Sequence, residues 1–75
     1  MGKARVRKEI KRVPLSVREV TLFRIANRRG YAALARRHLT EGRTPYQAYS
    51  RLVKACRRNG FELPMQTTPE LARMM

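Results

Sequence analysis

The chain has 75 residues, enough for one small domain with a core of modest size. It carries 18 lysine and arginine residues against five acidic residues, which gives a formal net charge of +13. Because neutralising phosphates releases counterions, so large an excess favours a polyanionic partner, and nucleic acid is the first candidate. No apolar run reaches the roughly 20 residues that a membrane-spanning helix requires, so we expect no membrane partner.

Chemistry-bearing side chains are few. The single cysteine, Cys56, excludes an internal disulfide and indicates a reducing compartment. From the small size and the charge of the chain we expect a cytoplasmic protein of bacterial, phage or plasmid origin. The only histidine, His38, and the scattered glutamates show no spacing typical of a catalytic pair or a zinc site, and the chain has no glycine-rich phosphate loop. The sequence therefore predicts a non-enzyme that needs neither a metal nor a cofactor.

The first 14 residues are basic and contain few large apolar side chains. Such a composition predicts a flexible arm over residues 1–14, because it offers too little apolar surface to offset the entropy of ordering. The arm either stays solvated or follows phosphates on a nucleic acid. Its candidate phosphate contacts are Arg5, Arg7, Lys8, Lys11 and Arg12.

Ser16–Glu19 matches the S-x-x-E pattern of a capping box, in which the first and fourth residues bond each other's backbone N–H groups. The pattern predicts a helix over residues 17–28, with Asn27–Gly30 as its end. Val20–Phe23 is also rich in the β-branched and aromatic residues that strands favour. A short strand in place of this helix therefore stays open.

A second helix is predicted over Tyr31–Leu39, because alanine, leucine and arginine are strong helix formers. In this helix Arg36 and Arg37 would face water or phosphate. Thr40–Arg43 follows as a turn, in which Gly42 would supply a positive φ.

The clearest helix is predicted over Pro45–Arg58. Thr44 is a favourable N-cap, proline suits the first helical position, and Asn59-Gly60 offers a left-handed end. One face of this helix is apolar, and it consists of Tyr46, Tyr49, Leu52, Val53 and Cys56. The opposite face is polar and cationic, and it consists of Gln47, Ser50, Arg51, Lys54 and Arg58.

Together these elements predict an all-α fold, a small three-helix domain over residues 15–64. A short loose tail over residues 65–75 follows, in which Thr68–Glu70 opens one further helical turn. The helices over residues 31–39 and 45–58, joined by a four-residue turn, have the arrangement of a helix-turn-helix, whose second helix enters the major groove.

This arrangement assigns roles to the polar side chains. Those able to face base edges are Gln47, Ser50, Arg51 and Lys54. Beside the arm, the expected phosphate contacts are Arg36, Arg37, Arg43, Arg57 and Arg58. A cationic face that binds phosphate only, or that is simply solvated, is the alternative interpretation.

Arg43-Thr44-Pro45 leads into a helix that contains Arg51-Leu52. This stretch resembles the opening of the recognition helix in GntR-type winged-helix repressors, and Leu34-Ala35 stands where those proteins have the preceding helix. The resemblance covers the hairpin only and implies duplex DNA as the partner.

We therefore expect a small DNA-binding protein, a transcriptional regulator that inserts the helix over residues 44–60 into the major groove. A homodimer would double the length of sequence that is read. Duplex DNA is favoured over RNA. The alternatives are an adaptor or inhibitor that binds an acidic surface of another protein, and a structural RNA-binding protein.

Overall fold

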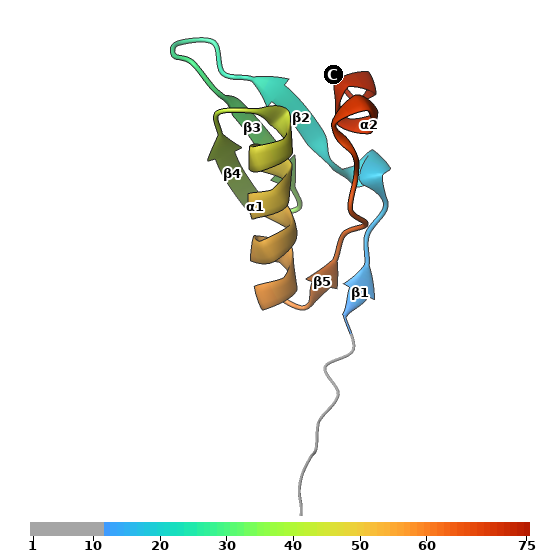
Figure 1. Ribbon diagram of the computed structural model, residues 1–75. Helices are drawn as coiled ribbons and strands as arrows, with labels where there is room; N and C mark the ends of the chain where they lie inside the picture. The colour runs from blue at the N-terminus through green and yellow to red at the C-terminus, as the bar shows by residue number, and fades with distance from the viewer. Residues whose placement is uncertain (1–11) are drawn as a thin grey trace, which may run out of the picture.

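The computed structural model describes residues 12–75, and these residues form an α/β fold built on a three-stranded antiparallel sheet (Figure 1). The strand order is β2–β3–β4, with bounds Thr21–Arg24, Tyr31–Ala35 and His38–Gly42. Helix α1, Pro45–Arg58, follows directly and packs against β3 and β4. The core therefore lies between this helix and one face of the sheet.

The remaining elements come from the first and last parts of the described chain. Strand β1, Val13–Pro14, pairs in parallel with β5, Phe61–Glu62, so the beginning of the domain lies beside the segment that follows α1. The 3-10 helix η2, Val17–Glu19, connects β1 to β2. The short helix α2, Thr68–Arg73, ends the chain and packs on α1.

The all-α prediction is wrong, because strands β3 and β4 replace the helix expected over residues 31–39. Ala33 and Ala35, which belong to the core cluster, are at most 1% exposed. The helix propensity of these alanines is overridden by tertiary packing, since small side chains in β3 let α1 approach the sheet closely.

The helix expected over residues 17–28 is also wrong beyond its first turn. The capping box between Ser16 and Glu19 is confirmed, but it starts only the three-residue η2. The backbone is already extended at Val20, and β2 follows at Thr21–Arg24. The strand left open over this segment is therefore the structure observed.

The turn between β3 and β4 is tight, because Ala35 pairs directly with His38. Arg36, the first of the two turn residues, has a φ of 58°. This left-handed conformation is typical of two-residue hairpin turns and costs an L-residue other than glycine roughly 1–2 kcal/mol. Arg36 therefore occupies a position that glycine or asparagine would fit with less strain.

The helix predicted over Pro45–Arg58 is confirmed at both ends. The Thr44 side chain accepts a hydrogen bond from the Gln47 N–H at 3.0 Å, and Asn59 is the C-cap. Gly60 follows with a φ of 88°, the left-handed end that the sequence predicts. Local capping signals therefore fixed the start and end of this helix.

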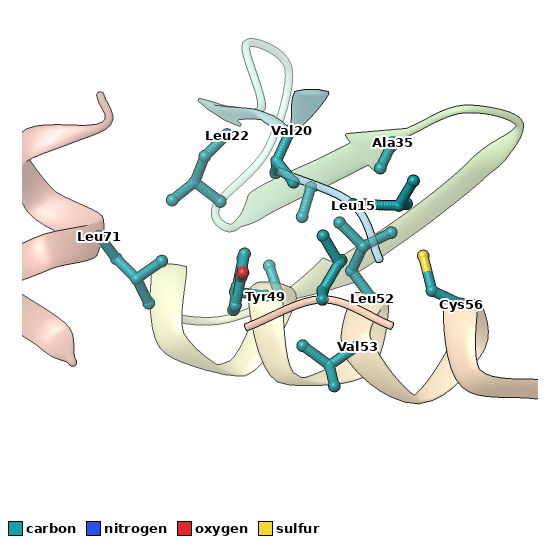
Figure 2. Close-up of a cluster of buried hydrophobic side chains, with 12 residues drawn as sticks. Leu15, Val20, Leu22, Ala35, Tyr49, Leu52, Val53, Cys56 and Leu71 are labelled. Carbon is teal, nitrogen blue, oxygen red and sulfur yellow. The ribbon is translucent and has the colours of Figure 1, made fainter. Parts of the chain in front are cut away.

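The inner face of α1 is largely the one predicted. Tyr49, Leu52 and Cys56 are buried and point from α1 toward the sheet (Figure 2), and Val53 is buried as well. Tyr46 is the exception, because its side chain is 45% exposed. Tyr46 stands one heptad before Val53 on the helix, but it does not belong to the core.

Gly42 has a different role from the one predicted. It is the last residue of β4, paired with Tyr31, and the residues with positive φ in the described chain do not include it. Here α1 approaches the strand so closely that a Cβ atom on Gly42 would lie 2.5 Å from the Ala48 nitrogen. Close approach of two backbones, and not turn conformation, therefore requires glycine at this position.

The segment after α1 is held by buried leucines. Leu63 and Leu71 are 1% and 0% exposed, and both belong to the same apolar cluster as Leu15 (Figure 2). The short helix expected near Thr68 is present as α2. Because Leu71 is buried, the tail that we expected to be loose packs against the domain.

Tyr49 is the one core side chain with a hydroxyl group, and this group donates a hydrogen bond to the Pro64 carbonyl oxygen. Tyr49→Phe removes this donor and is expected to lower the free energy of unfolding by about 1 kcal/mol. Urea denaturation at neutral pH measures the change. Tyr46→Phe, at an exposed position, is the matched control, and an equal loss in both variants would contradict the role of the hydrogen bond.

The same residue makes stability depend on pH. Burial, with a smaller effect of the nearby Cys56, raises the pKa of Tyr49 from 10.0 to about 12. As the pH rises, the unfolded chain therefore loses the Tyr49 hydroxyl proton before the folded chain does. The contribution of the neutral hydroxyl to the free energy of unfolding is complete below pH 10 and is lost as the pH rises through 12. In Tyr49→Phe, the free energy of unfolding should fall less steeply between pH 10 and pH 12 than in the parent protein.

Candidate nucleic-acid interface

The outer face of α1 carries a row of polar and cationic side chains. Gln47, Arg51, Lys54 and Arg58 recur at helical spacing on the side away from the core, and we call these four residues the cationic face. Arg51, Lys54 and Arg58 are exposed, whereas Gln47 is half-buried. The helix contains no acidic residue. Three of the four residues predicted to face bases thus share this face, and half-buried Ser50 lies beside it.

A pocket of about 320 Å³ adjoins the first turns of α1. The loop between β2 and β3 forms one wall, and the junction of β4 with α1 forms the other. We call it the arginine pocket, because its lining includes Arg28, Arg29, Arg43 and Arg51. The only carboxylate in the lining belongs to Glu41. Four cations and one anion thus surround a single cavity.

Hydrogen bonds fix several of these groups. Arg28 forms an ion pair with the Glu41 carboxylate, and Arg51 Nη1 donates to the Glu41 backbone oxygen at 2.8 Å. The Arg43 N–H donates to Gln47 Oε1 at 2.7 Å. Within residues 12–75, no carboxylate lies within 4.0 Å of the Arg29 or Arg43 guanidinium. Since the start of a helix also favours negative charge, the pocket is suited to an anion.

Three predicted phosphate contacts lie in ion pairs elsewhere. Arg36 pairs with Glu19 at 3.0 Å, and Arg57 pairs with Glu62 at 3.1 Å. Arg12 also approaches Glu62, at 3.8 Å. All these side chains are at least one-third exposed, and exposed pairs of this kind contribute at most about 1 kcal/mol. A phosphate could therefore compete for each of these arginines.

The other predicted contacts divide into two groups. Arg37 and Arg58 are exposed, the first in the β3–β4 turn and the second at the end of α1. The remaining arm residues lie outside the described residues, and they are Arg5, Arg7, Lys8 and Lys11.

Arg28 and Arg29 were missed as site residues, because we assigned them to the end of a helix. They lie in the loop of the β2–β3 hairpin. The signal that could have located them is Asn27–Gly30, a loop-forming stretch between two segments that can form strands.

The helix-turn-helix prediction is wrong, because α1 follows a strand and packs on a sheet. The resemblance to GntR-type repressors fails for the same reason, since Leu34-Ala35 lies in β3 and not in a preceding helix. What remains of the predicted hairpin is its second helix with its caps and cations.

Comparison with protein-family models, curated proteins and solved structures found no match to this chain. No helix within the described residues is long and apolar enough to cross a membrane.

Proposed function

We propose that this chain binds duplex DNA through the arginine pocket and the cationic face of α1. The observation that carries the proposal is the convergence of Arg28, Arg29, Arg43 and Arg51 on one cavity that contains a single carboxylate. Neutralising DNA phosphates with these groups releases counterions, which is the main source of sequence-independent affinity. The net charge of +13 adds long-range attraction to the same partner.

The dimensions of α1 support a groove as the binding site. Its 14 residues extend about 21 Å. The major groove of B-DNA is roughly 12 Å wide and admits an α-helix, so cations at the two ends of α1 can meet phosphates of opposite strands. The deep, narrow major groove of A-form RNA does not admit side chains in this way, so duplex DNA is favoured over duplex RNA.

A role in transcription regulation additionally requires sequence preference. On the cationic face, Gln47 can bond adenine in the major groove, and the arginine and lysine side chains can bond guanine. Preferential retention of particular genomic fragments in the presence of excess random DNA would support regulation. Equal retention of all genomic fragments would restrict the function to binding the DNA backbone without sequence preference.

The proposal is tested by fluorescence anisotropy with nuclease-treated full-length protein, random-sequence duplex DNA and a duplex RNA of the same length. The variant Arg43→Ala/Arg51→Ala removes two charges from the arginine pocket. It should weaken DNA binding at least tenfold and reduce the slope of log affinity against log salt by about 2. RNA should bind more weakly than DNA at every salt concentration.

The matched control is Arg18→Ala/Arg73→Ala, which removes the same charge from exposed positions on η2 and α2. Its DNA affinity should stay within about threefold of the parent. Circular dichroism and thermal melting verify that both double variants are folded. An equal loss of affinity in the two variants would show that net charge binds DNA without a defined site, and no loss in either would refute the proposal.

A further inference from the structure

A second pocket lies at the other end of α1, where the β3–β4 turn meets the C-cap of the helix. Its volume of about 510 Å³ falls within the range of small-ligand sites, roughly 300–1,000 Å³. We call it the aromatic pocket, and its lining consists of Arg36, Arg37, His38, Asn59 and Phe61. None of these five residues belongs to the arginine pocket.

The guanidinium of Arg36 is held on two sides. It lies 5.4 Å from the centroid of the Phe61 ring, and it pairs with the Glu19 carboxylate at 3.0 Å. The His38 ring meets Phe61 edge-on, with ring centroids 6.3 Å apart. The Arg36 side chain nevertheless stays 49% exposed. A planar cation that is oriented by an ion pair and an aromatic ring therefore borders the cavity.

The backbone conformation at Arg36 is unusual for an arginine. Its φ of 58° is a conformation that glycine or asparagine adopts at lower cost. An arginine here adds strain to the turn, and its side chain extends to Phe61, on a separate strand. The turn thus carries a long planar side chain at a position where a small residue would suit the backbone better.

The groups that line the cavity match a nucleotide better than a simple anion. Guanidinium planes and aromatic rings stack on nucleobases, and Arg37 supplies a second cation for the attached phosphate. Asn59 Nδ2 donates to the Ala55 carbonyl at 2.8 Å, which leaves its amide oxygen as an acceptor for a base amino group. A phosphate alone would make no use of the two rings.

We propose that the aromatic pocket receives one unpaired nucleobase of a bound DNA strand, stacked on the Arg36 guanidinium. This inference rests on the proposed DNA binding and adds a preference for DNA with an extrahelical base. Base stacking is sequence-tolerant, so the pocket distinguishes a base from no base more strongly than it distinguishes one base from another.

The test compares two DNA duplexes that differ at one position, a single-nucleotide adenine bulge and the same bulge without a base. The full-length parent protein should bind the adenine bulge about tenfold more tightly than the abasic bulge. Arg36→Lys keeps the charge but removes the planar group, and it should reduce this preference to less than about threefold. Its affinity for a fully paired duplex should stay within about threefold of the parent, because lysine still offers a charge to a phosphate.

Arg37→Lys is the matched control in the same turn and should keep the preference, because lysine also binds a phosphate, as a point charge. Phe61→Leu removes the ring beneath Arg36 and should lower the preference as Arg36→Lys does. Thermal melting shows whether each variant is folded. If either Arg36→Lys or Phe61→Leu is unfolded, the other of these two variants decides the outcome.

Equal binding of the two bulges by the parent protein would overturn the inference and leave the proposed DNA binding intact. An undiminished preference in Arg36→Lys, or an equal loss in Arg37→Lys, would also overturn it. Failure of the parent protein to bind any of the duplexes at low salt would refute both proposals.

Discussion

Gly42→Ala is expected to lower the free energy of unfolding by about 3 kcal/mol or more, the upper range for inserting atoms into a packed interior. The new Cβ atom would lie 2.5 Å from the Ala48 nitrogen and 2.9 Å from the carbonyl carbon and Cβ of Gln47. Two of these three atoms belong to the backbone of α1, so no side-chain rotation relieves the contact. The first turn of the helix would have to move away from β4.

Such a movement would disturb other interactions of the same turn. The Thr40 hydroxyl donates to the Ala48 carbonyl at 2.8 Å, and the Arg43 N–H is bonded to Gln47. A domain of this length has a total stability of about 4–11 kcal/mol, so the substitution would remove a large fraction of it.

Gly60→Ala provides the control, because it introduces the same methyl group where no atom lies within 4 Å. Gly60 has a φ of 88°, so this substitution should lower the free energy of unfolding by about 1–2 kcal/mol through backbone strain alone. Guanidinium denaturation followed by circular dichroism compares the two variants. A Gly42→Ala protein that is as stable as Gly60→Ala would contradict the close approach of α1 to β4.

Leu52→Ala is expected to cost roughly 2–5 kcal/mol, the range measured for deleting a buried leucine side chain. Leu52 is 0% exposed and lies among the core side chains between α1 and the sheet (Figure 2). Because the surrounding side chains come from several elements, the cavity left by the substitution would weaken the whole domain.

Leu39→Ala removes the same atoms from a side chain that is 56% exposed on β4. It should change the free energy of unfolding by no more than about 0.5 kcal/mol. The two leucine variants are compared by the same denaturation experiment. Similar midpoints would mean that the inner face of α1 is not packed against the sheet.

Helix α1 could be predicted because its signals are local. Thr44, Pro45 and Gly60 mark its ends, and the side chains between them alternate between two faces at helical spacing. Such signals depend on neighbours in the sequence and survive in almost any tertiary setting. The capping box at Ser16 was equally local, but it defined only where a helix starts and not how far it continues.

The β3–β4 hairpin could not be predicted, because its pattern runs against the usual alternation of large apolar and polar residues. Ala33 and Ala35 face α1 and are buried, whereas Leu34 and Leu39 are paired on the opposite face and are exposed. The side chains that pack inward are small, since the helix lies close to the strand. A strand with small inward and large outward side chains lacks the alternation that is typical of strands. From the sequence alone it therefore resembles a helical segment.

The candidate site was predicted in part for the same reason. The cations of α1 followed from a helix that was correctly placed. The arginine pocket also needs Arg28 and Arg29, and their position beside Arg43 depends on the hairpin that brings the β2–β3 loop to the start of α1. The spacing of these arginines in the sequence does not indicate that they lie close together in the fold.

The close packing of α1 on alanines has a consequence for the energetics of binding. Ala33, Ala35 and Ala48 are at most 1% exposed, so the helix and the hairpin form one unit with little room for relative movement. The backbone positions of Arg43 and Arg51, at the junction of β4 with α1 and on α1 itself, are therefore preorganised before a ligand arrives. At these two positions binding restricts side-chain rotamers only, and the entropy lost per contact is smaller than for a basic segment that folds on its target.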